Sequence, residues 1–426
     1  MPVVRGTVKN ASGVIQVGFP VKIELMPDST PGFVVAQDFT VSAPVVMATD
    51  AGGNYEATLI GNDNILPPAN SFYTVWEGTR SFNIRVPTTG GPYRVEDLLA
   101  DYPVPPPTEP TSLFGMKGLQ QSYDLSTTFF DAADALNTGI VRLTADFAQL
   151  FPTALATDFA ALDAAVDYCW NKGLKICMCP TYNPGWLGAY HGNPTDHAVW
   201  ATKLALLVSR YLGKGVVGWE IWNEPNHGPF WSDPSPTAYT DLLAQCAPWI
   251  RNQDSAAVIV TGGTSPRSTD TTNVDLTQRG YKPSDWLVQL YLAGAAPHFD
   301  AVGHHPYCYP FEPTYEADWN SFLESEDLHN ISVWVGDPKP VWGTEWGYPT
   351  GPEGDPFVVK TVSEATQATR IQQAFAAWRA WSWGGPLIYF CWKDDPGLAP
   401  DPVQTAGIYQ SDGVTPKVAA ATFQAL

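Results

Sequence analysis

The chain has 426 residues, 44% of them hydrophobic and 15% charged, which is enough for one large domain with a well-packed core and a smaller second domain. Its formal net charge of -20 disfavours nucleic acid and anionic membrane surfaces as partners, because the summed field repels polyanions. Aromatic residues make up 13% of the chain, and flat rings with a polar edge suit a neutral, glycan-like ligand as well as a core.

Six cysteines stand at positions 169, 177, 179, 246, 308 and 391. Their spacing does not match the paired CxxC arrangement of a zinc site, so we predict buried free thiols and folding in a reducing cytoplasm. The first residues, MPVVRGTVKNASG, lack the pattern of a signal peptide, and no apolar run approaches the roughly 20 residues that span a bilayer. We therefore expect a protein made in the cytoplasm that acts outside a cell only after lysis or inside a particle.

Short runs rich in β-branched and aromatic residues fill the first hundred residues, separated by Gly, Asn, Asp and Pro. They are VVRGTVKN, FPVKIELMP, GGNYEATLI, NSFYTVWEG and SFNIRVPTT. This pattern predicts a small all-β sandwich over residues 1–102. A proline-rich stretch, PVPPPTEP, marks a linker over residues 103–111, because consecutive prolines hold an extended backbone.

Strands then alternate with amphipathic helices over residues 112–426. The predicted strands are 113–119, 139–146, 174–181, 216–224, 256–263, 299–306, 340–346 and 386–392. Helical spacing appears between them, for example in ATDFAALDAAVDYCWNKG, where Gly173 is placed to end the helix. Eight such repeats predict a (β/α)₈ TIM barrel, an α/β fold. A doubly wound open sheet is the alternative, but it requires a phosphate-binding glycine loop after the first strand, and none is evident.

Two glutamates end predicted strands four and seven, and barrel enzymes carry their reactive groups at such strand ends. Glu224 lies in GWEIWNEPNHG, and Glu345 lies in GTEWG. A pair of carboxyl groups flanking one bond is what glycoside hydrolysis requires, one to protonate the leaving oxygen and one to attack or to activate water.

Three motifs resemble those of the clan A glycoside hydrolases, which are retaining (β/α)₈ enzymes. They are Ile221-Trp222-Asn223-Glu224-Pro225-Asn226, His305-Pro306-Tyr307 and Gly343-Thr344-Glu345-Trp346-Gly347. Within the clan, the Asn-Glu-Pro-Asn form is similar to family 39 xylosidase-like and some family 5 cellulase-like members. The N-terminal runs resemble the transthyretin-like modules found beside enzymes and in phage tail proteins.

The resemblance implies a role for each motif residue. Glu224 would be the general acid/base and Glu345 the nucleophile. Asn223 would hold the 2-hydroxyl of the sugar, Arg142 and Tyr307 would bond the nucleophile, and His305 would line the same pocket. Trp392 would form the platform under the sugar. Further subsites beyond the cleavage point are expected to draw on Trp186, Trp346, Trp222 and Trp231.

The residues themselves support this division of roles. A nucleophile must be ionised, so a charged Arg and a phenol donor belong beside Glu345. A general acid must hold its proton, and we expect a raised pKa for Glu224 next to Trp222 and a second carboxylate. His304 should point to the opposite side of the strand from His305 and pack in the interior. No cofactor or metal is predicted, since no His pair has the helical spacing of a zincin.

Three functions remain open from the sequence. The first is a retaining glycosidase that cuts a neutral bacterial surface glycan as part of a phage virion, attached to other tail proteins by its N-terminal domain. The second is a receptor-binding or structural tail protein whose barrel grips a glycan without cutting it. The third is a cytoplasmic or lysis-released bacterial exoglycosidase with a carbohydrate-binding sandwich.

Overall fold

The computed structural model describes ten short strands between residues 3 and 94, and then residues 113–120, 125–395, 397 and 402–426. The predicted linker 103–111 lies outside the described residues. Two compact units divide the chain, and along the sequence their boundary falls between Pro106 and Pro107.

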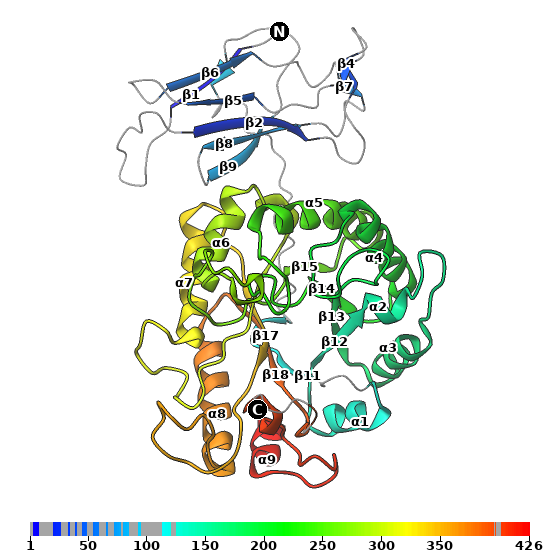
Figure 1. Cartoon of the computed structure of the whole chain (residues 1–426), viewed down its shortest axis with the longest axis vertical. Helices are drawn as coiled ribbons and strands as arrows, with labels where there is room; N and C mark the ends of the chain where they lie inside the picture. The colour runs from blue at the N-terminus through cyan, green and yellow to red at the C-terminus, as the bar shows by residue number, and fades with distance from the viewer. Residues whose placement is uncertain are drawn as a thin grey trace. The chain divides into compact units, whose positions relative to one another are not determined.

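The first unit contains short, mostly antiparallel strands (Figure 1). Their bounds are β1 Val3–Thr7, β2 Pro20–Met26, β3 Phe33–Val34, β4 Phe39–Thr40, β5 Val45–Ala48, β6 Asn54–Thr58, β7 Ile65–Leu66, β8 Phe72–Glu77, β9 Arg80–Ile84 and β10 Tyr93–Arg94. They pair in the orders β10-β1-β6, β5-β2-β8-β9 and β4-β3-β7. Each of the five predicted β runs contains a strand, namely β1, β2, β6, β8 and β9. That these sheets form a sandwich stays a prediction.

Eight parallel strands form the second unit's sheet. They are β11 Lys117–Gln120, β12 Ile140–Asp146, β13 Lys175–Thr181, β14 Val216–Ile221, β15 Val258–Thr261, β16 Val302–His304, β17 Val341–Trp346 and β18 Gly384–Phe390. Their order is β15-β14-β13-β12-β11-β18-β17-β16. The two ends of this order meet through parallel bridges from Val260 to Ala301 and from Thr264 to His304. The predicted TIM barrel is therefore confirmed, and the open doubly wound sheet is wrong.

Helices follow the strands and surround the barrel (Figure 1). Their bounds are α1 Thr127–Ala135, α2 Phe147–Leu150, α3 Ala160–Lys172, α4 His197–Tyr211, α5 Pro236–Gln253, α6 Pro283–Leu292, α7 Ser321–Trp334, α8 Glu364–Ala380 and α9 Val418–Ala425, with 3₁₀ turns at Leu276–Gln278, Ala296–His298 and Pro402–Thr405. Local sequence sets several ends. Asp196 and Ser235 cap α4 and α5 by accepting backbone N–H bonds, and Gly173 ends α3 with φ +71°, as predicted.

The barrel interior is filled by alternating large and small residues. The ring of Trp342 projects into it, and a Cβ at Gly218 or Gly385 would lie 2.7 or 2.5 Å from that ring. Around it pack apolar residues of several strands, among them Ile140, Val260 and Ile388. The interior is thus a packed core that supports the strand ends.

All six cysteines are free and buried, which confirms the thiol prediction. Burial raises the pKa of Cys169 to about 12, so this thiol is inert at neutral pH. Among the described residues, no helix has the length and apolar character needed to cross a bilayer.

Candidate active site

The backbone turns sharply where β14 ends, and this turn aims Glu224 into the barrel mouth. The predicted strand 216–224 stops at Ile221, and Trp222 and Glu224 follow with φ of 72° and 47°. Residues other than glycine rarely adopt this left-handed region, and such strain concentrates at functional sites. The Glu224 N–H bonds the Gly263 carbonyl at 3.1 Å, which ties the turn to the neighbouring strand end.

Asn226 explains the second half of the Asn-Glu-Pro-Asn motif. It is fully buried, and its amide donates to the carbonyls of Ser265 and Tyr281 while its Oδ1 accepts from the Ser265 N–H at 2.9 Å. All three bonds reach the segment after β15. Asn226 therefore fixes the Glu224 loop to its neighbour and does not face a ligand.

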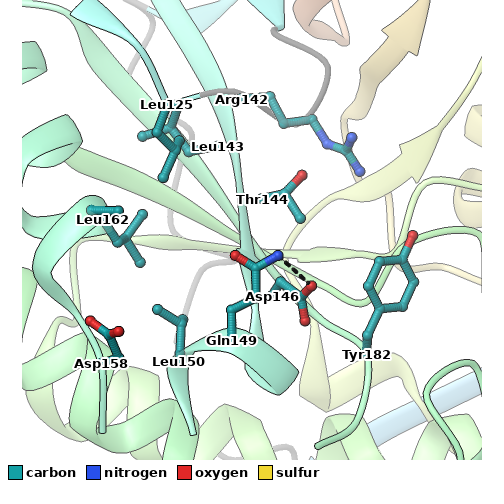
Figure 2. A pocket seen from close by; sticks show the side chains of 11 residues that line it. Leu125, Arg142, Leu143, Thr144, Asp146, Gln149, Leu150, Asp158, Leu162 and Tyr182 are labelled. Atoms are coloured by element: carbon teal, nitrogen blue, oxygen red, sulfur yellow. Dashed lines mark hydrogen bonds between the residues drawn. The ribbon is translucent and has the colours of Figure 1, made fainter. Parts of the chain in front are cut away.

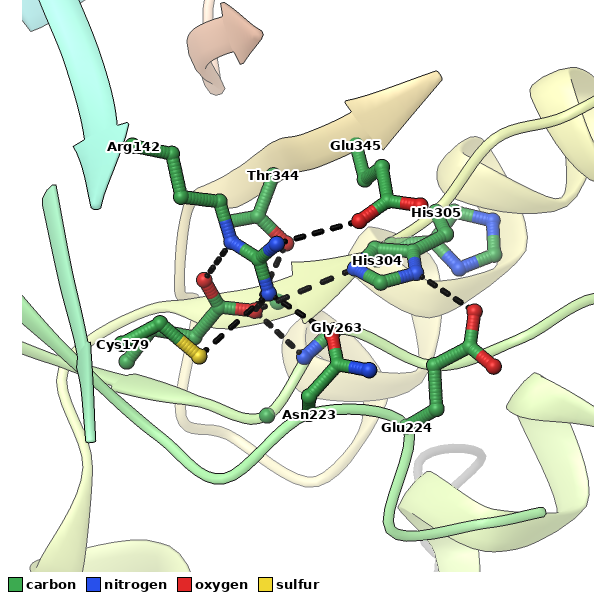
Figure 3. Close-up of polar contacts among 12 residues, drawn as sticks. Arg142, Cys179, Asn223, Glu224, Gly263, His304, His305, Thr344 and Glu345 are labelled. Atoms are coloured by element: carbon green, nitrogen blue, oxygen red, sulfur yellow. Dashed lines mark hydrogen bonds and ion pairs between the residues drawn. The ribbon is translucent and has the colours of Figure 1, made fainter. Parts of the chain in front are cut away.

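Glu224 and Glu345 face each other across the mouth of the barrel (Figure 3). Ligand atoms of Glu224, His305 and Glu345 lie within 4.8 Å of one another. Retaining glycosidases hold their carboxyl groups about 5 to 5.5 Å apart, whereas inverting enzymes leave about 6.5 to 9.5 Å for a water molecule. The spacing here suits direct attack by one carboxylate.

Three donors point at the carboxylate of Glu345. Arg142 Nη1 and Gln120 Nε2 donate to Oε2 at 3.0 and 3.2 Å, and the Tyr307 hydroxyl donates to Oε1 at 2.8 Å. Arg142 and Tyr307 therefore lie where the sequence predicted them. Gln120 stands one residue beyond the predicted first strand, which the structure moves from 113–119 to Lys117–Gln120 because Gly115 takes a turn with φ +60°.

Glu220 lies beneath Glu224 and Glu345 and was not predicted as a site residue. Arg142 donates to both of its oxygens, Nε at 2.5 Å and Nη2 at 3.0 Å. Its Oε1 also accepts from the Gly263 N–H and the Thr344 hydroxyl, each at 2.9 Å. Burial alone would raise the pKa of Glu220, but the charges and hydrogen bonds of Arg142 and His305 together outweigh this and lower it to about 2.

Arg142 is consequently held on several sides. Besides Glu220, Gln120 and Glu345, it donates to Asn223 Oδ1 at 2.8 Å. Burial lowers the pKa of Arg142, yet Glu220, Cys179 and Glu345 together raise it well above its usual range, so the guanidinium remains charged. Asp146, at the end of the same strand, caps α2 by accepting the Ala148 N–H.

Glu224 is paired with imidazoles, and its predicted pKa shift is wrong in direction. His305 Nδ1 lies 2.8 Å from Glu224 Oε1, and His227 Nδ1 lies 3.5 Å from Oε2. Burial raises the pKa of Glu224, but hydrogen bonds with His227 and His305 outweigh it and lower the pKa below its ordinary range. Burial lowers the pKa of His305, while Glu345, Glu220 and Glu224 raise it above its ordinary range. Trp222 packs beside the turn, but the pKa of Glu224 is set by burial and by the two imidazoles.

The prediction that His304 packs in the interior is confirmed. His304 is fully buried and bonds Thr264 Oγ1 through Nδ1 and the Ser321 carbonyl through Nε2, both at 2.9 Å. Its pKa falls to about 4, chiefly because of burial. It holds α7 against β16 on the outer side of the strand.

The predicted tryptophan contacts lie outside the carboxylate cluster. Trp346 follows Glu345 on β17 and so faces the other side, where its ring packs against Phe375 of α8 and Tyr389. Trp186 donates to the Phe151 carbonyl and stacks near Lys203. The burial of Trp346 favours packing, and the role of Trp186 at a further subsite stays a prediction.

Trp392 lies just beyond the end of β18 and is 2% exposed. Its ring contacts those of Phe129 and Tyr409, and Lys393 lies over it. The sugar-platform role of Trp392 stays a prediction. Trp222 and Trp231 are fully buried and contact each other, which favours packing for both.

Strand alternation could have revealed Glu220. Side chains two apart on a strand face the same way, so Gly218 and Glu220 share the inward face of β14. His227 offered no comparable signal, because its contact with Glu224 depends on the turn after the strand.

A small pocket adjoins the site on the β12 side (Figure 2). Its volume is about 130 Å³, and Arg142, Thr144, Asp146, Gln149 and Tyr182 are among its lining residues. Ligand pockets commonly hold about 300 to 1,000 Å³. This pocket is therefore too small to be a complete binding site and extends the barrel mouth on the β12 side.

Glu224, His305 and Glu345 also offer donor atoms of the kinds that zinc accepts. The absence of a metal centre accordingly stays a prediction. Each of the three side chains already has a protein partner, as the contacts in Figure 3 illustrate.

Many solved structures share the fold, among them three glycosidases that match 73% of this chain or more. A family 39 glycoside hydrolase from Bacteroides cellulosilyticus WH2 matches with a TM-score of 0.58 and 15% identity, over 99% of this chain and 80% of that one. A glucosidase from Croceicoccus marinus matches with a TM-score of 0.55 and 16% identity, over 73% and 67%. A monomeric beta-xylosidase from Caulobacter crescentus CB15 matches with a TM-score of 0.51 and 17% identity, over 74% and 67%. At these identities the likeness concerns the fold alone.

No curated protein sequence matches the chain. The family model described as cellulase, glycosyl hydrolase family 5, matches residues 104–386, which is more than half of the chain. The closed barrel and the facing glutamates described above agree with that match. The chain belongs to glycosyl hydrolase family 5 and is a glycoside hydrolase.

Proposed function

We propose that the chain is a retaining glycosidase that hydrolyses a neutral polysaccharide by double displacement. Glu345 is the nucleophile and Glu224 the general acid/base. The observation that carries this proposal is the approach of the two carboxylates, whose oxygens lie within 4.8 Å across the mouth.

In the first half of the reaction, a Glu345 oxygen attacks the anomeric carbon and forms a glycosyl ester. The bond to the leaving oxygen breaks, and that oxygen takes a proton from Glu224. Arg142, Gln120 and Tyr307 hold the attacking carboxylate in place through three hydrogen bonds. In the second half, Glu224 removes a proton from water, which attacks the anomeric carbon and releases Glu345.

The proton for the first half is held by the Glu224 and His305 pair. Because the Glu345 charge helps to raise the pKa of His305, converting Glu345 into a neutral ester weakens the pair's hold on its proton. The pair is then ready to accept a proton from water. A proton shared between Glu224 and His305 thus takes the place of the raised Glu224 pKa that the sequence led us to expect.

The test is sugar release from a panel of neutral polysaccharides and whole bacterial cell walls. Glu224→Gln and Glu345→Gln keep the side-chain shape but remove the proton donor or the nucleophile, so each should lower kcat by about 10² to 10⁴ or more. Glu326→Gln, an exposed change on α7, is the matched control and should leave kcat unchanged.

A glycan-gripping protein without activity is the rival function. Wild-type protein that binds a glycan of the panel but releases no sugar, with equal binding by both Gln variants, would support the rival. The paired donors around Glu345 favour catalysis, because a binder has no need of a positioned carboxylate.

The biological setting is a separate proposal. A place in a phage virion, with a bacterial surface glycan as substrate, is supported by the resemblance of the N-terminal runs to tail modules. Immunogold labelling of purified virions tests it, and unlabelled particles would refute it.

A further inference from the structure

An exposed group of aromatic rings lies on the loops that follow β16 and β17. We call it the aromatic patch, and it consists of Phe311, Tyr315, Trp319 and Phe357. Phe311 is its buried centre, with ring centroids 4.7 Å from Tyr315, 4.7 Å from Trp319 and 5.2 Å from Phe357. The outer three rings are 36%, 50% and 66% exposed.

The patch is fixed by buried hydrogen bonds. Asn320, which is 2% exposed, donates to the carbonyls of Pro313 and Tyr315 at 2.9 and 2.7 Å. The hydroxyl of Tyr348 donates to the Phe311 carbonyl at 2.8 Å. These buried hydrogen bonds hold the loop backbone, and with it the exposed rings, in one position.

The patch lies a short distance along the chain from Tyr307 and Glu345. Tyr307, whose hydroxyl bonds Glu345, has its ring 5.7 Å from that of Tyr309. Phe311 follows two residues later, and four residues of chain reach at most about 14 Å. Tyr348, the anchor on the other loop, is three residues beyond Glu345. Both loops therefore begin at the cleavage point and lead to the patch.

The charges around the patch restrict its ligand. Four exposed acids lie on the same loops, namely Glu316, Asp318, Glu353 and Asp355, beside one exposed base, Lys360. The acids outnumber the base and repel polyanions, as does the net charge of -20. Exposed aromatic faces with such a rim stack on sugar rings through their apolar faces.

We propose that the aromatic patch is a distal sugar-binding subsite, so that the substrate is a neutral glycan chain of several units and not a single sugar on a small leaving group. This inference rests on the proposed glycosidase function and specifies its substrate class. One unit of the chain binds at Glu224 and Glu345 while a more distant unit stacks on Trp319 and Phe357.

The experiment compares a polymer with a small substrate. For each neutral polysaccharide that the wild type cleaves, kcat/KM is measured beside that for the aryl glycoside of the same sugar. Trp319→Ala and Phe357→Ala should each lower polymer kcat/KM by about 3- to 10-fold, the loss of one ring contact. Both should leave aryl glycoside hydrolysis unchanged. Trp319→Phe should restore most of the loss, and Trp170→Ala, which removes a 51% exposed ring on α3, should change neither.

A binding experiment that does not depend on cleavage distinguishes the failure of this inference from the failure of the proposed function. Retardation of Glu345→Gln in native gels containing xylan, galactomannan, hydroxyethyl cellulose or arabinogalactan is measured with and without Trp319→Ala. Retardation that Trp319→Ala abolishes supports the subsite even if the wild type cuts none of these polymers, in which case only the proposed function fails. Retardation that is independent of Trp319, no retardation in any gel, or equal losses on polymer and aryl glycoside would overturn the subsite.

Discussion

In the proposed mechanism, Glu224 and His305 hold one proton between them, and this pair should set the basic limb of the pH profile. In the wild type, the proton is retained until the raised pKa of His305 is passed. In His305→Asn, Glu224 must hold the proton alone, and its pKa lies lower than that of the imidazole. We therefore expect the basic limb of kcat/KM to move to lower pH by about one unit or more.

The measurement is a pH profile of kcat/KM on any soluble substrate that the panel identifies. His197→Asn, a change at a half-buried histidine of α4 that is paired with Asp241 of α5, should leave the limb in place. An unchanged limb in His305→Asn would show that the proton is held elsewhere.

Single residues also show where sequence reasoning reaches its limit. Glu345, Tyr307 and His305 were found because motif order along a repeating fold identifies strand ends. The pKa direction at Glu224 was missed because it depends on His227 and His305, two imidazoles brought to the same carboxylate by different loops. Long-range contacts of this kind leave no local pattern.

At the scale of elements, local chemistry predicts helices better than it predicts strand ends. The helix predicted after the second strand ends at Gly173 as expected, since a left-handed C-terminal residue favours glycine. The fourth strand ends three residues early because Trp222 adopts a backbone conformation that its residue type does not suggest. Tertiary packing, including the tie from Glu224 to Gly263, imposes that turn.

The cap of α4 offers a test at this scale. Asp196 accepts a hydrogen bond from the Val199 N–H at 2.9 Å, so Asp196→Ala should lower the free energy of unfolding by about 1 kcal/mol. Asp196→Asn keeps an acceptor and should lie close to the wild type. Urea unfolding followed by tryptophan fluorescence measures both, and equal stability of all three proteins would contradict the capping role.

The charge of the whole molecule bears on substrate choice. The protein has a net charge of -20, so it repels an acidic glycan at long range. A neutral glycan feels no such long-range force. We expect kcat/KM on a neutral polysaccharide to vary less than about twofold between low and high salt. Any activity on an acidic polymer should rise with salt, and the comparison is made by reducing-sugar release. A strong fall with salt on the neutral polymer would point to cationic recognition.

The barrel also divides its chemistry between two halves of the polypeptide. Arg142, Glu220 and Glu224 precede the end of α5, while His305, Tyr307 and Glu345 follow the start of β15. Glu220 bonds groups from both halves, Arg142 on one side and Gly263 and Thr344 on the other. If the chain is cut between α5 and β15, each fragment lacks half of the proposed site residues. Activity regained on mixing the fragments would therefore report that the eight-stranded barrel had closed.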